Sequence, residues 1–112
     1  MNITVVVATC NRAAMLERML QALARQTMPA SGFAVGGALD GVTDDSRAVC
    51  ERMTSILPNL AILTLEQQQG QTRALIRGLA AARTEKLAFT DDDCVPEPGW
   101  LERMDRELDS HE

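Results

Sequence analysis

Four short runs of apolar residues recur along the chain, and each has the length of a buried β-strand. They cover residues 3–8, 33–39, 60–65 and 87–90. The first run is the richest in β-branched side chains, which favour extended structure. The second contains Gly36 and Gly37, which weaken a strand because glycine adds backbone freedom and packs no side chain. The pattern therefore predicts four strands.

Between these runs, the apolar positions change to the spacing of amphipathic helices. The first stripe predicts a helix over residues 13–26, with Asn11 as a candidate N-cap. Further stripes predict helices over residues 44–57, 71–83 and 98–109. Thr43 is the candidate cap of the helix over 44–57, whose first turn is rich in Asp and Ser.

Strand and helix alternate along the chain, and this order is typical of βαβ units. We therefore predict an α/β fold in one domain, residues 1–112, with a Rossmann-like, mostly parallel sheet of about four strands flanked by helices. Ligands of such sheets bind outside the carboxyl ends of the strands. The polar segments 9–12, 40–43 and 91–93 each follow a strand and are predicted to line one crevice.

Composition narrows the range of partners. The net charge is −5 and there is no block of Lys or Arg, which argues against nucleic acid. Three cysteines without CxxC spacing, and one histidine, suggest neither a disulfide framework nor a structural zinc site. No signal peptide is recognised and no apolar run is long enough to span a bilayer, so we expect a cytoplasmic protein without a transmembrane segment.

Three consecutive carboxylates, Asp91, Asp92 and Asp93, follow the fourth strand where it emerges from the core. Like charges in a row repel one another, and a bound divalent cation would reverse that energy. Mg²⁺ and Mn²⁺ bind carboxylate oxygens and keep open positions for phosphate oxygens. The segment predicts a metal–diphosphate site; the alternative is a charged loop in which Asp93 or a neighbour caps the next helix.

Several other chemistries find little support in the sequence. Neither a GxGxxG segment after the first strand nor a phosphate-binding GxxxxGK[ST] loop is present. Cys10 and Cys94 have no histidine within reach and are interpreted as packing residues rather than nucleophiles. A phosphatase-type nucleophilic Asp within 91–93 lacks the flanking signature expected of such enzymes.

Three segments in series carry a resemblance to a known family. They are Thr9-Cys10-Asn11-Arg12, Leu39 to Asp45, and Phe89 to Leu101, which contains the acidic triplet. In order and spacing they resemble the inverting family-two glycosyltransferases of GT-A fold, specifically their N-terminal nucleotide-binding half. The resemblance implies an enzyme that binds a nucleotide-diphosphate sugar, linked to UDP or GDP, and transfers the sugar to an acceptor.

The resemblance also implies roles for individual positions. The turn after the first strand borders the base, and the Asp after the second strand faces the nucleoside. The acidic triplet resembles the DxD element, which holds ribose and a Mg²⁺ or Mn²⁺ ion. In the helix predicted over residues 71–83, Arg73 or Arg77 is a candidate to contact the phosphate or the base in place of the family's usual residue. The alternative is that both side chains lie on a solvated face of that helix. The nucleotide-binding candidates are Thr9, Asn11, Arg12, Asp40, Arg73, Asp91 and Asp92, and the metal-binding candidates are Asp91 and Asp93.

The chain also departs from the family pattern. Leu39-Asp40-Gly41-Val42 stands where the family often has Asp-Asp-Gly-Ser. The acceptor half of the family has no counterpart in the sequence, so neither the catalytic base nor the acceptor is predicted. A sugar-nucleotide pyrophosphorylase is disfavoured because it would need a Gly-rich, basic loop after the first strand. The open alternative is an inactive remnant acting as an oligomeric or interaction module, in which self-association covers an exposed sheet edge.

Overall fold

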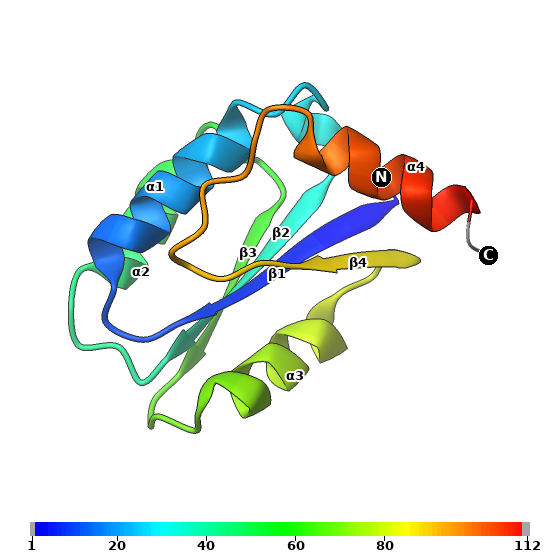
Figure 1. Ribbon diagram of the computed structural model, residues 1–112. Helices are drawn as coiled ribbons and strands as arrows, with labels where there is room; N and C mark the ends of the chain where they lie inside the picture. Colours follow the sequence, from blue (N-terminus) through cyan, green and yellow to red (C-terminus); the bar gives the residue numbers. More distant parts are fainter. Residues whose placement is uncertain (1, 111–112) are drawn as a thin grey trace.

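The computed structural model describes residues 2–110, in which strands and helices alternate in the predicted order (Figure 1). The elements are β1 (Ile3–Thr9), α1 (Ala13–Ala24), the short 3-10 helix η1 (Ala30–Gly32), β2 (Ala34–Asp40), α2 (Ser46–Met53), β3 (Leu60–Leu65), α3 (Gln71–Ala81), β4 (Lys86–Phe89) and α4 (Trp100–Ser110). Among these described residues, none of the helices combines the length and apolarity that crossing a bilayer requires.

The four strands form one parallel sheet in the order β3-β2-β1-β4. β1 lies inside the sheet, with Val5 opposite Val35 of β2 and opposite Ala88 of β4. Every residue of β1 is buried, as its β-branched sequence predicts for a central strand. The α/β prediction is confirmed, and the carboxyl ends of all four strands lie at the same edge.

Helices cover both faces of the sheet, but unequally (Figure 1). α1, α2 and α4 lie on one face, and α3 lies alone on the other. The three-helix face buries large side chains, among them Leu16, Leu20, Phe33 and Leu101. Burial of such side chains supplies most of the favourable free energy of folding, so this face is the main core.

The α3 face buries mainly small side chains, including Ala38 and Ala74. Gly78 of α3 lies directly against the sheet, where an added Cβ would come within 3.0 Å of Val6 Cγ1. Glycine in a helix interior costs stability relative to alanine. Here its missing side chain allows α3 to approach β1 closely.

Two helices begin later than predicted. α2 begins at Ser46 rather than residue 44, because the Asp44 carboxylate accepts a hydrogen bond from the Ser46 N–H (3.0 Å) and holds the chain in a turn. α4 begins at Trp100 rather than residue 98, after a turn in which the Trp100 N–H donates to the Glu97 carbonyl (3.0 Å). In both places a local hydrogen bond delays the helix.

The segment between β4 and α4 is anchored to the rest of the fold. Buried Gln26, just after α1, donates from Nε2 to the Glu97 carbonyl (2.7 Å) and accepts from the Leu101 N–H (3.0 Å). Lys86, the first residue of β4, pairs through Nζ with Asp105 in the middle of α4 (2.8 Å). The acidic triplet therefore lies on a connection whose route is set by contacts on both of its flanks.

Candidate functional site

The carboxyl ends of β1, β2 and β4, with the turn after β3, surround a polar pocket of about 460 Å³. Its lining residues are Ala8, Thr9, Cys10, Arg12, Asp40, Gln68, Gln71, Asp91, Asp92 and Asp93. The three strand-end segments that the sequence predicts to share a crevice do meet there. The pocket is therefore the candidate functional site.

Asp92 is buried in the wall of this pocket. Its Oδ2 accepts a hydrogen bond from Thr9 Oγ1 (2.6 Å), and its Oδ1 accepts one from Arg12 Nη1 (3.3 Å). Hydrogen bonds to an ionised carboxylate are stronger than those between neutral groups. Asp92 thus fastens the turn after β4 to the turn after β1, and both of its oxygens already have protein partners.

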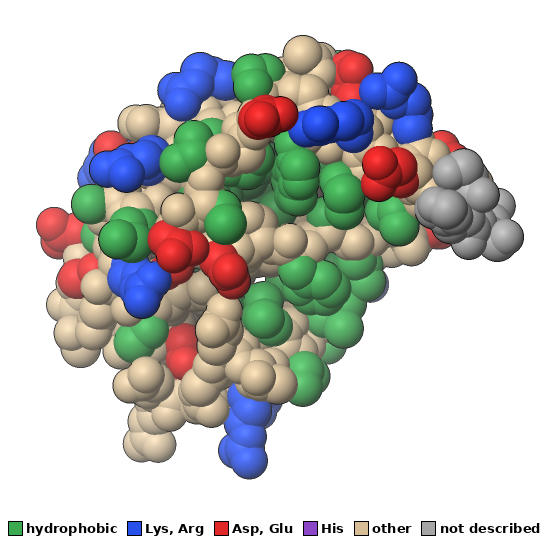
Figure 2. Space-filling model, viewed as in Figure 1, with side chains coloured by type: hydrophobic (Ala, Val, Ile, Leu, Met, Phe, Trp, Pro, Cys, Tyr) green, Lys and Arg blue, Asp and Glu red, His purple; other side chains and the backbone are tan. Residues whose placement is uncertain are grey.

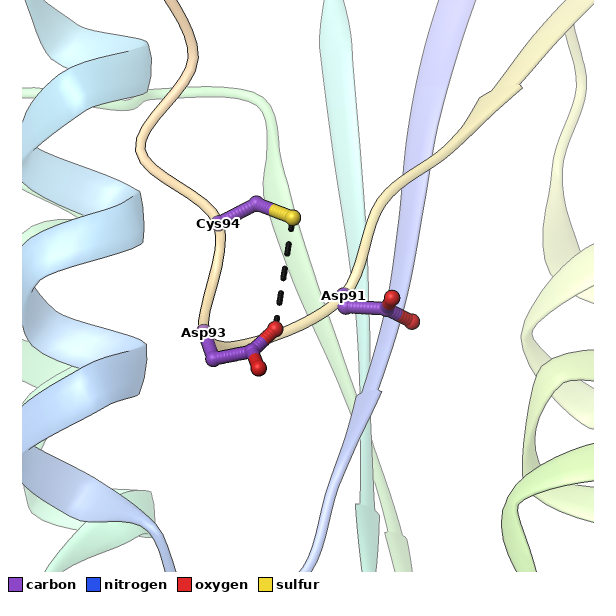
Figure 3. Close-up of side chains that lie close together, drawn as sticks. All are labelled: Asp91, Asp93 and Cys94. Atoms are coloured by element: carbon purple, nitrogen blue, oxygen red, sulfur yellow. Dashed lines mark hydrogen bonds between the residues drawn. The ribbon is translucent and has the colours of Figure 1, made fainter.

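Asp91 and Asp93 flank this anchor and are exposed. Ligand atoms of Asp91, Asp93 and Cys94 all lie within 4.8 Å of one another. Figure 3 shows the three side chains on the turn after β4, with the Cys94 thiol directed at Asp93 Oδ1 (4.0 Å). The Asp91 carboxylate also accepts a hydrogen bond from Gln71 Nε2 (3.2 Å). These residues form an accessible group of metal-ligand atoms at the pocket.

Asp40 is the last residue of β2 and is 3% exposed. Its Oδ1 accepts from the Gln69 N–H (2.7 Å) and its Oδ2 from the Gly70 N–H (2.9 Å). The carboxylate thus satisfies backbone donors at the start of α3, where negative charge favours the helix dipole. Asp40 shapes the pocket by holding the turn that precedes α3.

The prediction that Asn11 caps α1 is wrong. Asn11 adopts a left-handed backbone conformation (φ 53°), and its Oδ1 accepts from the N–H groups of Thr43 (2.7 Å) and Asp44 (3.2 Å). Asn11 therefore ties the turn after β1 to the turn after β2, because asparagine tolerates this conformation better than most residues. Thr43 likewise makes no side-chain cap of α2.

A second contact joins the same two turns: the Asp44 carboxylate accepts a hydrogen bond from the Ala13 N–H (3.1 Å) at the start of α1. The helix thus receives its cap from a different turn. Asp44 is exposed, and although its slight desolvation opposes ionisation, the hydrogen bonds from Ser46 and Ala13 outweigh that effect and lower the pKa of the carboxyl. The hydrogen bonds from Ser46 and Ala13 thus stabilise the charged form of Asp44.

The structure brings six of the eight predicted site residues to the pocket lining, namely Thr9, Arg12, Asp40, Asp91, Asp92 and Asp93. Asn11 does not line the pocket, and Arg73 is exposed on α3 outside the lining. Sequence reasoning missed Gln68 and Gln71. The available signal for Gln71 was its place at the start of a helix directly after a strand end, which points a side chain at the crevice.

A family model described as Glycosyl transferase family 2 matches residues 4–112. The chain belongs to glycosyl transferase family 2. This confirms the family resemblance carried by the strand-end motifs. The matched range also includes β3 and α3, which lie between the strand-end motifs.

Two curated relatives match nearly all of this chain but are much longer. Glycosyltransferase AglE of Haloferax volcanii is 32% identical over 101 residues, which are 90% of this chain and 33% of AglE. Validoxylamine A glucosyltransferase of Streptomyces hygroscopicus is 32% identical over 102 residues, which are 91% of this chain and 24% of that protein. The chain therefore spans a third or less of the length of these relatives.

Solved glycosyltransferase structures share the fold. S. aureus TarS 1–349 in complex with UDP-GlcNAc matches with a TM-score of 0.91 at 28% identity, covering 99% of this chain and 32% of that one. Mannosyltransferase PcManGT from Pyrobaculum calidifontis, in complex with GDP-Man and Mn²⁺, matches with a TM-score of 0.79 at 26% identity, covering 87% of this chain and 29% of that one. The four-stranded parallel sheet and its helices are thus part of a GT-A fold.

Proposed function

We propose that this chain is the donor-binding part of a glycosyltransferase and holds a nucleoside-diphosphate sugar through a divalent cation. The observation that carries the proposal is the pair of exposed carboxylates, Asp91 and Asp93, at a polar pocket built from strand carboxyl ends. The similar structures of TarS with UDP-GlcNAc and of PcManGT with GDP-Man and Mn²⁺ support the class of ligand.

The donor set fits Mg²⁺ or Mn²⁺, because both ions prefer oxygen ligands and accept carboxylates together with phosphate oxygens. Asp93 is the first-choice contact for the ion, and Asp91 contacts the ion or the ribose. Both carboxylates are exposed on one turn, so an ion reaches them without the fold opening. When bound, the ion neutralises the negative charge that develops on the departing nucleoside diphosphate.

The residues around the carboxylates supply the remaining contacts. The Arg12 side chain is 53% exposed and commits Nη1 to Asp92, which leaves its other N–H donors for a phosphate or base. Thr9 and Asp40 form the pocket wall on the β1 and β2 side. Gln71 adds an amide beside Asp91. We assign these residues to binding and orienting the nucleotide.

Transfer of the sugar also needs a base that takes the proton of the acceptor hydroxyl. We assign no described residue to that step. AglE and the TarS 1–349 chain are each about three times as long as the matched region. Transfer to an acceptor is therefore proposed for a whole protein that includes this region, and donor binding is proposed for the region itself.

Calorimetric titration with UDP and GDP, each with and without Mn²⁺, tests the proposal directly. We expect binding of at least one nucleotide that requires the ion. Asp93→Asn should weaken it by about tenfold or more, in line with the loss of a metal ligand. Glu85→Gln is the matched control, because it removes one negative charge from an exposed position just before β4, at the opposite end of that strand. Absence of binding in protein shown to be folded would overturn the proposal.

A second candidate function is self-association through the β4 edge. β4 is the terminal strand on its side of the sheet, and Phe89 and Val95 beside it are both more than half exposed. Figure 2 shows hydrophobic side chains gathered over β4 and in the hollow between α4 and α3. A second copy would cover this surface and pair the open edge. Sedimentation should then show a dimer that Phe89→Ser disrupts; a monomer at every concentration rejects this candidate.

A further inference from the structure

The turn after β4 offers a thiol beside its two exposed carboxylates. Resting on the donor-binding proposal above, we propose that Cys94 is a third ligand of the cation and biases the site toward Co²⁺ and Zn²⁺ over Mg²⁺. A pair of carboxylates alone would favour Co²⁺ and Zn²⁺ over Mg²⁺ less strongly, because carboxylate oxygens also suit Mg²⁺ well.

The geometry of the turn brings the thiol to the ion. The Cys94 N–H donates to the Asp91 carbonyl (3.2 Å), which closes a turn and places these two side chains three positions apart on one loop. Cys94 Sγ lies 4.0 Å from Asp93 Oδ1. Ligand atoms of Asp91, Asp93 and Cys94 lie within 4.8 Å of one another.

These separations suit a shared ion. Oxygen ligands lie about 2.1 Å and sulfur ligands about 2.3 Å from a zinc-sized cation, so two ligands on opposite sides of it are about 4.4 Å apart. The cluster therefore needs only small side-chain rotations to close on an ion. All three side chains belong to one exposed turn, so the approach of an ion from solvent is open.

The chemistry of sulfur sets the expected preference. Thiolate is a softer ligand than carboxylate and favours late first-row ions, whereas Mg²⁺ requires hard oxygen ligands and keeps several waters. A coordinated thiol releases its proton to solvent. For a site of mixed oxygen and sulfur donors, affinity should rise from Mg²⁺ through Mn²⁺ to Co²⁺ and Zn²⁺.

The other two cysteines are internal controls. Cys50 is buried in the main core, and burial raises the pKa of its thiol to about 11. Cys10 lines the same pocket on the β1 side but lies outside the ligand cluster. A thiolate signal that depends on Cys94 and not on Cys10 would therefore locate the sulfur ligand on the turn after β4.

Titration with Co²⁺, followed by absorption, tests the inference on the whole chain. A sulfur ligand produces a near-ultraviolet thiolate-to-cobalt charge-transfer band, which oxygen ligands do not. We expect this band in wild type and in Cys10→Ser, and its loss in Cys94→Ser. The affinity of Cys94→Ser for Co²⁺ should fall about tenfold or more, while its affinity for Mg²⁺ should stay unchanged.

Two outcomes separate this inference from the donor-binding proposal. If Mn²⁺-dependent nucleotide binding is intact but Co²⁺ gives no charge-transfer band, or one that persists in Cys94→Ser, then Cys94 is not a ligand and donor binding stands. If the band appears and depends on Cys94 but no nucleotide binds with any cation, then the turn holds a metal and the donor-binding proposal fails.

Discussion

The two sides of the candidate site use the same residue type in opposite ways. On the β1 and β2 side, the carboxylates of Asp40 and Asp44 accept hydrogen bonds from backbone N–H groups. On the β4 side, Asp91 and Asp93 are exposed, and neither accepts a hydrogen bond from a backbone N–H within the described residues. Asp92 lies between Asp91 and Asp93 in sequence, but like Asp40 and Asp44 it accepts a hydrogen bond from another part of the fold, in this case from Thr9.

The difference separates carboxylates that hold backbone N–H groups of neighbouring turns from exposed carboxylates that a ligand can reach. A carboxylate saturated by protein donors stabilises the fold and offers little to a cation. An exposed pair of like charges contributes nothing to folding and is stabilised when a cation arrives. Substitution of Asp40, Asp44 or Asp92 should therefore lower the stability of the fold. Substitution of Asp91 or Asp93 should weaken ligand binding.

The largest loss of stability is expected for Asp40→Ala. It removes a buried acceptor of two backbone hydrogen bonds and leaves the donors at the start of α3 unpaired. Because hydrogen bonds to a charged group contribute about 1.5–3 kcal/mol each, the free energy of unfolding should fall by about 3 kcal/mol. Chemical denaturation measures this, and Asp40→Asn, which keeps one acceptor oxygen, should lose less. A change within about 0.5 kcal/mol would show that the Asp40 hydrogen bonds do not stabilise the fold.

Asp92→Ala should cost less, about 2 kcal/mol, since it breaks one buried contact to Thr9 and one ion pair to half-exposed Arg12. A double-mutant cycle with Thr9→Val isolates the buried contact. We expect a coupling energy of about 1 kcal/mol or more between residues 9 and 92. Additive effects would show that the hydrogen bond does not stabilise the fold.

A smaller and pH-dependent effect is expected for Asp44→Asn. The folded-state pKa of Asp44 is lowered below its unfolded value, so its charge stabilises the fold above the unfolded pKa, which is about 3.9. That stability is lost as pH falls through the folded-state pKa. The stability difference between wild type and Asp44→Asn should be constant at neutral pH and shrink below about pH 4. Unfolding curves collected across this pH range test the prediction. A pH-independent difference would show that the charge of Asp44 does not stabilise the fold.

The smallest change in stability is expected for Asp93→Asn, which should stay within about 0.5 kcal/mol of wild type because the side chain is exposed. Relief of repulsion from Asp91 should even favour the variant slightly. The same substitution should remove Mn²⁺-dependent nucleotide binding. Thermal unfolding with and without Mn²⁺ shows both effects, since the ion should raise the melting temperature of wild type only. Destabilisation as large as that of Asp92→Ala would remove the contrast between the two sides.

The order of elements could be predicted because hydrophobic periodicity is a local property of the chain. The strand with Gly36 and Gly37 forms as predicted even though glycine is unfavourable there, because it pairs on both sides in the interior of the sheet. Helix starts were less predictable. α2 begins late because the Asp44 carboxylate accepts a hydrogen bond from the Ser46 N–H, which competes with helical hydrogen bonding.

The site was only partly predictable, for a related reason. Strand-end position placed Thr9, Asp40 and the acidic triplet at one crevice. Asn11 was misassigned because capping propensity is local, whereas its actual partner is the backbone of Thr43, 32 positions away. Arg73 is exposed on α3 outside the pocket lining, in agreement with the alternative of a solvated helix face, and its contact with a nucleotide stays a prediction.

The sequence alone determined the parallel α/β fold and the acidic turn, since both follow from residue types and spacing within short stretches. It could not determine which aspartate is available to a ligand. Three adjacent aspartates are chemically identical until Thr9, 83 positions earlier, donates to the middle one. Tertiary structure made that choice, because the fold buries Asp92 against the turn after β1 and leaves Asp91 and Asp93 exposed.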